Sequence, residues 1–152
     1  MQQIFLDGIA LSELFENGYR NLKKNMNVIN DLNVFPVPDG DTGTNMVKTF
    51  SGGLSLAGNQ TENVGQYMQK LSNGVLLSAR GNSGVIFSQF IHGLYRGFEG
   101  KEKIEFCDFA YAFECATEDS YNAILSPAEG TILTIIREAS QFLKTNGRKF
   151  SD

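Results

Sequence analysis

Apolar residues return at helical spacing along most of this chain. In residues 8–30 they recur every three or four positions, which is the period of one face of an α-helix, and they comprise Ile9, Leu14, Phe15, Tyr19, Leu22, Met26 and Ile29. A second such face in residues 106–124 comprises Phe106, Phe109, Ala110, Phe113, Thr117 and Tyr121. No segment keeps the alternation of a β-strand, so the pattern predicts an all-α fold.

The predicted helices have recognisable limits. Six are expected, over residues 8–30, 42–56, 63–79, 82–98 and 106–124 and from 127–129 to about 143. Residues 31–40 are predicted to be a loop, because Pro36 and Pro38 cannot continue a helix. Pro127 suits the first turn of the last helix, and Lys144-Thr145-Asn146-Gly147-Arg148 is predicted to end it. This series is typical of an antiparallel helical bundle or barrel.

The composition agrees with one soluble domain. The chain has 152 residues, of which 41% are hydrophobic and 20% charged, as in an ordinary globular protein with one core. The net charge is −4, and the basic residues are scattered, so nucleic acid is not an expected partner. No apolar run approaches the ~20 residues of a membrane span, and no signal peptide is indicated. We therefore expect a cytoplasmic protein.

Thiol and imidazole groups are few. Cys107 and Cys115 are eight residues apart, which fits one face of a helix and not a CxxC or metal motif, so both are predicted to be reduced core thiols. His92 is the only histidine, and no GxSxG motif accompanies it, so a Ser–His–Asp hydrolase is not indicated. His92 is predicted to lie on a helix surface or in the core.

The most unusual chemistry gathers where a helix is predicted to begin. Asp39 and Asp41, separated by Gly40, can converge on one hard cation. They are followed at the helix start by Thr42, Gly43, Thr44 and Asn45. Free N–H groups and the helix dipole attract anions there, and a cation site beside an anion site suits Mg²⁺–nucleotide. The alternative is an ordinary capped turn, which Asp, Gly and Thr also form.

Two further helix starts are rich in glycine and polar residues. The first is Ala79-Arg80-Gly81-Asn82-Ser83-Gly84, where glycines let the backbone approach a ligand and Arg80 could reach a phosphate. The second is Ser126-Pro127-Ala128-Glu129-Gly130-Thr131. Either alone could be a plain connection between helices. Three such starts in one small domain favour a shared ligand at one end of the bundle.

Competing motifs fail on their spacing. An EF-hand that began at Asp39 or Asp41 would need glutamate at Phe50 or Gly52. A DxDxT phosphatase motif would need threonine at Gly43 and a buried strand before it. The GxxxxGK[ST] phosphate-binding loop is absent.

Three segments together resemble one known family. They are LNVFPVPDGDTGTNM at 32–46, SARGNSGVIFSQ at 78–89 and SPAEGTILT at 126–134. In order and over nearly the whole chain, they closely resemble the N-terminal kinase domain of bacterial fatty acid kinase, which is similar to the nucleotide-binding L subunit of dihydroxyacetone kinase. The resemblance implies an α-helical barrel with ATP or ADP and a pair of Mg²⁺ ions at one end.

The resemblance also implies roles for individual residues. Asp39 and Asp41 match two of three metal-holding aspartates, and the third position falls at Asn33, which departs from aspartate. Phosphate contacts are implied for Thr42, Gly43, Thr44, Asn45, Asn82, Ser83 and Gly84. Thr131 is expected near the nucleotide, and Arg80 is expected to assist phosphoryl transfer.

On this resemblance, residues 1–152 form a nucleotide- and magnesium-binding kinase domain with about six of the family's usual eight helices, cut short at its C-terminus. The expected reaction moves a phosphoryl group from ATP to a fatty acid carboxylate and gives an acyl phosphate. A DegV-like fatty-acid-binding carrier protein would present the acid, and a homodimer would form through further domains. This fragment alone is expected to be inactive. Three alternatives stay open: transfer to dihydroxyacetone or another small ketone, a non-catalytic nucleotide-binding module, and a calcium-stabilised helical domain.

Overall fold

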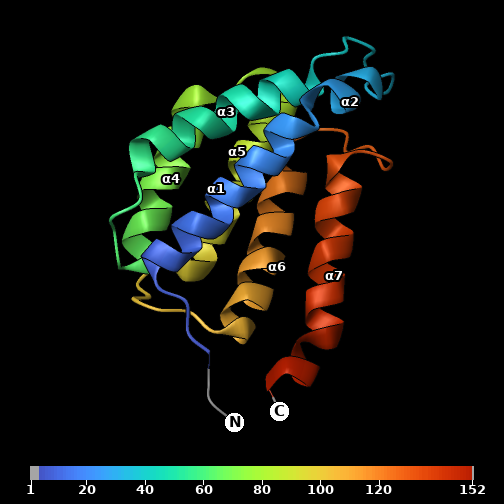
Figure 1. The fold of residues 1–152 in the computed structure, drawn as a ribbon. Coiled ribbons are helices and arrows are strands. Elements are labelled where there is room, and N and C mark those ends of the chain that lie inside the picture. Colours follow the sequence, from blue (N-terminus) through green and yellow to red (C-terminus); the bar gives the residue numbers. More distant parts are fainter. Residues whose placement is uncertain (1–3, 152) are drawn as a thin grey trace.

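Seven helices make up residues 4–151, the part of the chain that the computed structural model describes (Figure 1). They are α1 (Gly8–Lys24), α2 (Met26–Asp31), α3 (Thr42–Ala57), α4 (Val64–Ser78), α5 (Gly81–Phe98), α6 (Phe106–Asn122) and α7 (Ile132–Ser151). Within that range the only β pairing is one isolated antiparallel bridge between Leu6 and Ile104. The predicted all-α class is therefore confirmed. No described helix is both long enough and apolar enough to cross a membrane.

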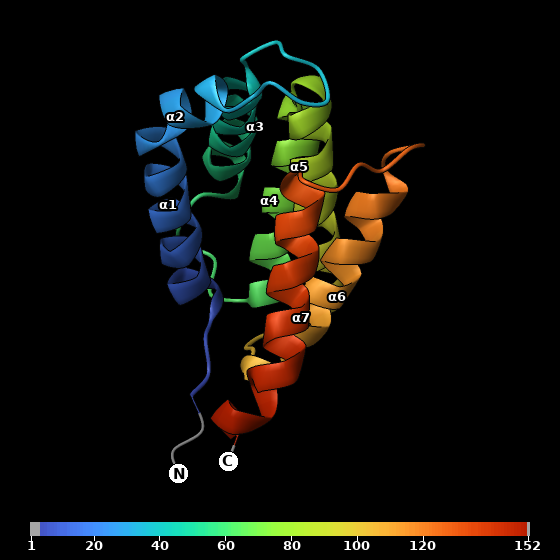
Figure 2. The same cartoon turned by 90° about the vertical axis from the view of Figure 1, so that its right-hand side faces the viewer.

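Most helices pack beside the next one along the chain. The pairs α3–α4, α4–α5, α5–α6 and α6–α7 are all in contact, and the long helices run in alternate directions (Figures 1 and 2). Helix α1 packs against α3 and α4, and the short α2 contacts α3. The starts of α3, α5 and α7 consequently lie at one end of the domain, opposite the two chain ends (Figure 2).

The core explains why these segments are helical. Each long helix presents an apolar face, and the fully buried large side chains include Leu11, Tyr67, Leu71, Ile91 and Phe98. A second, smaller cluster joins Ile86 on α5 to Leu133 and Ile136 on α7. Burial of one large apolar side chain stabilises a fold by roughly 1.5–3 kcal/mol, so these faces, more than intrinsic propensity, hold the helices in place.

Small residues let α5 and α6 lie unusually close. A Cβ atom added to Gly93 would lie 2.3 Å from the Cα atom of Ala116, and one added to Gly97 would lie 2.4 Å from the Cα atom of Ala112. These distances are below any ordinary contact, so glycine is required at both positions. We call the close packing of Gly93 and Gly97 against Ala116 and Ala112 the α5–α6 seam.

The first predicted helix is broken in the structure. Residues 8–30 were expected to be continuous, but α1 ends at Lys24 and α2 begins at Met26. The intervening Asn25 has φ −97° and ψ 6°, and its side-chain amide donates to the carbonyl oxygen of Asn21 at 2.8 Å. The apolar period continues across the break, which is why periodicity did not reveal it.

The last helix differs from its prediction at both ends. It begins at Ile132 instead of 127–129, because the Thr131 hydroxyl accepts the N–H of Leu133 at 3.3 Å and leaves Pro127 in the preceding loop. The predicted stop after Leu143 is also wrong, since α7 continues to Ser151. Gly147 lies within α7, where an added Cβ would be 2.9 Å from the Phe106 ring.

The two cysteines have different surroundings. Both lie on α6 and both are free thiols, as predicted. Cys115 is buried, but Cys107 is exposed, so the prediction that both are core thiols is wrong for Cys107. Eight residues correspond to a rotation of 80° around a helix, enough to take Cys107 off the buried face.

Candidate functional site

Asp39 and Asp41 lie in the loop that leads into α3, at the upper edge of Figure 2. Gly40 between them has φ +65°, a conformation that glycine adopts without strain. Both aspartates are exposed, and neither carboxylate has a hydrogen bond or an ion pair with any residue that the structure describes. Two uncommitted carboxylates this close in sequence can both reach one hard cation.

Two asparagines from outside the helix cap the start of α3. Asn33 Oδ1 accepts the N–H groups of Asp41 at 3.1 Å and Thr42 at 3.3 Å. Asn30, on α2, accepts the N–H of Thr44 at 3.0 Å, and its amide donates to the Thr44 hydroxyl at 2.9 Å. Asp41 occupies the N-cap position but makes no side-chain bond to its own helix. The two asparagines therefore cap the helix in place of an N-cap side chain, and the Asp41 carboxylate stays free.

Gly43 allows α2 and α3 to meet at this point. An added Cβ would lie 2.4 Å from the carbonyl oxygen of Met26 and 3.0 Å from Asn30 Oδ1. The N–H groups of Thr42 and Thr44 are bound to asparagines, whereas the N–H of Gly43 has no acceptor among the described residues. Gly43 is buried, and its N–H is an unpaired backbone donor at the positive end of the helix dipole.

The start of α5 lies directly against the start of α3. The Ser83 hydroxyl donates to the carbonyl oxygen of Thr42 at 3.5 Å. Gly81 has φ +61°, and a Cβ there would be 2.5 Å from the side-chain nitrogen of Asn45. The structure therefore brings Thr42, Asn45, Gly81 and Ser83 together, although the two helices are separated in sequence by α4.

Arg80 and Asn82 lie at the rim of this junction, and both are exposed. The Arg80 guanidinium donates to the carbonyl oxygen of the neighbouring Ala79 at 3.1 Å. It has no ion pair with any described residue, so its charge is available to an anionic ligand.

The loop before α7 forms a separate polar network at the same end of the domain. The Glu129 carboxylate accepts hydrogen bonds from Thr134 at 2.6 Å, Tyr121 at 2.8 Å and Arg137 at 3.2 Å. The hydrogen bonds from Thr134 and Tyr121, with a smaller effect of Arg137, lower the pKa of Glu129 below its ordinary value. No described hydrogen bond links Thr131 to α3 or α5; its hydroxyl donates to Ala128 O at 2.7 Å. The start of α7 therefore lies at the same end of the domain as the starts of α3 and α5, but no described hydrogen bond joins it to them.

A rival cation site fails on its bonding. The side chains of Glu105, Cys107 and Asp108 lie within ligand distance of one another. Asp108, however, pairs with Lys101 at 2.7 Å and accepts the N–H of Glu105 at 2.9 Å, as part of the capping box that begins α6. The Glu105 and Asp108 carboxylates are therefore accounted for by helix capping, which leaves Cys107 without the partners that a cation site needs.

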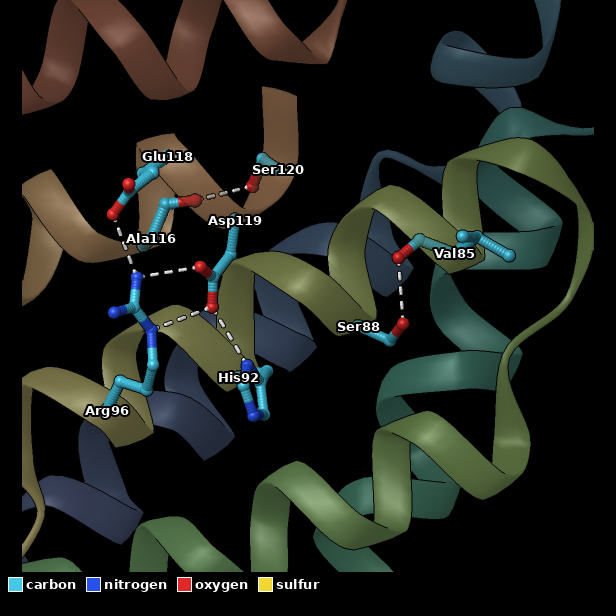
Figure 3. Close-up of polar contacts among 8 residues, drawn as sticks. All are labelled: Val85, Ser88, His92, Arg96, Ala116, Glu118, Asp119 and Ser120. Atoms are coloured by element: carbon cyan, nitrogen blue, oxygen red, sulfur yellow. Dashed lines mark hydrogen bonds and ion pairs between the residues drawn. The ribbon is translucent and has the colours of Figure 1, made fainter. Parts of the chain in front are cut away.

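His92 belongs to a clamp between α5 and α6 (Figure 3). Its Nδ1 lies 2.8 Å from Asp119 Oδ2, and Arg96 reaches the same carboxylate at 2.7 Å and 3.2 Å. The nearby Ser88 is buried, and its hydroxyl donates to the carbonyl oxygen of Val85. His92 was predicted to lie on a helix surface or in the core, and the structure places it on the surface of α5, where its side chain is 44% exposed. The Ser88 hydroxyl is bound to Val85 and not to His92, so these residues do not form a Ser–His–Asp triad.

Comparison with known proteins finds a matching family and several relatives. Residues 36–152 match the DAK2 domain. The chain belongs to the DAK2 domain family. It is 42% identical over 137 residues to protein YloV of Bacillus subtilis, and 40% identical over 137 residues to an uncharacterised protein of Staphylococcus epidermidis. Each alignment covers 90% of this chain but 25% of the relative, so the chain spans about a quarter of the length of these curated relatives.

The residues of this DAK2 domain fit the Mg²⁺ that the family implies. The donors at the start of α3 are carboxylate oxygens, which Mg²⁺ prefers, and no described cation competes for them. An anion donor, the N–H of Gly43, lies in the same turn. Asp39 and Asp41 could hold such an ion together with the phosphates of a nucleotide.

Sequence reasoning missed two residues of this candidate site. Asn30 was placed in a helix with no function, and Thr49 was read only as part of the helix over 42–56. Each makes its decisive contact with a residue far along the chain, 14 residues away for Asn30 and 31 for Thr49. Asparagine near a proline-rich loop was the one available signal, because asparagine is a common cap.

Proposed function

We propose that the adjoining starts of α3 and α5 bind Mg²⁺–nucleotide, and that this domain is the nucleotide-binding part of an ATP-dependent kinase. DAK2 domains are associated with ATP-dependent phosphoryl transfer. The observation that carries the proposal is the pair of uncommitted carboxylates, Asp39 and Asp41, at a helix start that other residues cap.

Each residue has a defined task in this proposal. Asp39 and Asp41 hold Mg²⁺, which supplies charge neutralisation at the phosphate oxygens. The free N–H of Gly43 and the start of α5 face the phosphates, and the exposed Arg80 is free to turn towards them. Asn33 shapes the loop through its bonds to Asp41 and Thr42, and its contact with metal stays a prediction.

The acceptor we favour is a fatty acid carboxylate presented by a fatty-acid-binding carrier protein. A carboxylate oxygen would form the new bond to the γ-phosphorus as the bond to the bridging oxygen of ADP breaks, giving acyl phosphate and ADP. No proton has to be removed, which suits a site whose charged groups are Asp39, Asp41 and Arg80. A hydroxyl acceptor such as dihydroxyacetone would need a base. In this proposal both carboxylates of the site hold Mg²⁺, and the only histidine belongs to the α5–α6 clamp.

Calorimetric titration of ADP with and without Mg²⁺ tests the nucleotide site. We expect Mg²⁺-dependent binding that the Asp39→Asn, Asp41→Asn double variant loses by at least about tenfold, as removal of charged ligands predicts. Asp31→Asn is the matched control, because Asp31 is an exposed carboxylate at the other end of the same loop. Equal binding in the double variant and the control would exclude the proposed site.

A second assay tests the acceptor. Because this chain alone is expected to be inactive, a full-length protein that contains the domain is incubated with ATP and either a carrier loaded with fatty acid or dihydroxyacetone, and acyl phosphate is trapped with hydroxylamine. Hydroxamate with the carrier alone supports the acyl acceptor. Phosphorylated ketone would support the small-ketone alternative, and nucleotide binding without either product would support a non-catalytic module.

A further inference from the structure

Thr49 lies beneath the proposed site and makes two polar contacts there. It is on α3, one turn after Asn45, and it is fully buried. Its hydroxyl donates to the carbonyl oxygen of Asn45 at 2.8 Å and accepts the backbone N–H of Arg80 at 3.1 Å. One oxygen atom therefore joins the first turns of α3 to the residue that precedes α5.

The first turn of α5 is fitted closely around this hydroxyl. An added Cβ on Gly84 would lie 2.5 Å from Thr49 Oγ1, so a side chain there would displace one of the two helices. The neighbouring contacts are less directional: Gly81 rests against the side chain of Asn45, and the Ser83 bond to Thr42 is long at 3.5 Å. Thr49 thus supplies the shorter of the two described hydrogen bonds between the helix starts, at 3.1 Å against 3.5 Å for Ser83.

This contact sets the distance between two groups that must act together. Asp39 and Asp41 belong to the start of α3, and Arg80 belongs to the start of α5. A site that holds a cation and phosphates at once depends on their relative position to within about 0.5 Å. We propose that Thr49 is a positioning residue, which couples the cation-binding half of the site to the nucleotide-binding half. This inference rests on the proposed function.

The hydroxyl group itself, rather than the volume of the side chain, carries the proposed effect. In Thr49→Val the shape is kept, but the N–H of Arg80 loses its acceptor against a buried methyl group. Thr49→Ser keeps the hydroxyl and loses only a methyl group. The matched control is Thr117→Val on α6, because the Thr117 hydroxyl makes the same kind of bond to the carbonyl four residues earlier, at 2.8 Å. No hydrogen bond among the described residues joins Thr117 to α3 or to the start of α5.

The readout is the ratio of ADP affinities measured by calorimetry with and without Mg²⁺, together with the melting temperature. We expect Thr49→Val to lower this ratio by about five- to tenfold, the factor that one buried hydrogen bond supplies. Thr49→Ser and Thr117→Val should keep the wild-type ratio, although Thr117→Val should lose some stability. Gly84→Ala displaces α5 while keeping the hydroxyl, so it should lower the ratio as Thr49→Val does. It replaces Thr49→Val in the experiment if that variant does not fold.

The outcomes separate the two proposals. If the wild-type protein binds ADP without any effect of Mg²⁺, the proposed function fails and the role of Thr49 fails with it. If the wild-type protein shows the Mg²⁺ effect and neither Thr49→Val nor Gly84→Ala reduces it, the proposed function stands and the coupling role is refuted. A ratio lowered equally by Thr117→Val would also refute it, because the effect would then follow from general loss of stability.

Discussion

Replacing Asn30 by alanine should reveal which residue caps α3. In the native protein Asn30 makes two hydrogen bonds to Thr44, at 3.0 Å and 2.9 Å. Each is worth about 1 kcal/mol net, so the gross loss is about 2 kcal/mol. Asp41, however, is already at the N-cap position, and its carboxylate can accept the N–H of Thr44 once Asn30 is gone. Such a cap recovers about 1 kcal/mol.

The effects of substituting Asn30 and Asp41 on the free energy of unfolding should therefore not be additive. Asp41→Ala alone should change the free energy of unfolding by no more than ~0.5 kcal/mol, because Asp41 makes no capping bond in the native protein. Asn30→Ala alone should lose about 1 kcal/mol, and the double variant about 2 kcal/mol. The coupling energy between the two positions is then about 0.5–1 kcal/mol. Asn30→Ala should also weaken Mg²⁺-dependent ADP binding, since the new bond of Asp41 competes with the cation.

Urea denaturation without Mg²⁺, followed by circular dichroism, measures all four proteins. If Asp41→Ala destabilises the native background as much as the Asn30→Ala background, the two residues do not share the capping role and the reasoning fails. The same holds if Asn30→Ala leaves nucleotide binding unchanged while the coupling energy is present, because a recruited Asp41 could then not be a ligand of the cation.

Two further predictions concern the rest of the domain. Gly97→Ala should destabilise the protein by about 1–3 kcal/mol, because the new Cβ would lie 2.4 Å from the Cα atom of Ala112. Gly18→Ala, in α1 with nothing within 4 Å, should stabilise it by up to about 1 kcal/mol; thermal unfolding of both variants checks this, and a stabilised Gly97→Ala would contradict the seam. The pKa of Glu129 is lowered in the folded state by Thr134 and Tyr121, so its contribution to stability is present above the ordinary value of 4.5 and is lost as the pH falls through the lowered value. Glu129→Gln should therefore flatten the stability–pH curve below 4.5, and parallel curves in urea titrations would show that the network adds nothing.

The sequence predicted the helices well where an apolar face determines them. The predicted helix over 106–124 corresponds to α6 within two residues at its C-terminal end. The side chains of its predicted face are half-buried, and the fully buried positions lie beside that face, at Ala112, Cys115, Ala116 and Ser120. The prediction from sequence failed where a single local or distant contact determines where a helix begins, breaks or ends. The break at Asn25, the cap by Thr131 and the passage of α7 through Gly147 against Phe106 leave no mark on the period.

The candidate site was predicted in its motifs but not in its supports. Asp39, Asp41 and the starts of α3 and α5 stand out as unusual local sequence, and the structure brings the two starts together. Asn30 and Thr49 look like ordinary polar positions on a helix. Their roles come from hydrogen bonds to residues that only the tertiary fold brings near, which a pattern along the chain does not contain.

The pairing of each helix with the next one has a consequence for how this domain forms. Contacts between neighbours in sequence close short loops, and chains dominated by such contacts fold quickly for their size. Helices α3 to α7 can add one at a time in the order in which they are synthesised. Helix α1 differs, because its partners α3 and α4 do not follow it directly in the chain. We therefore expect its apolar face to be the first exposed surface of the nascent domain, and to stay exposed until α4 has been synthesised.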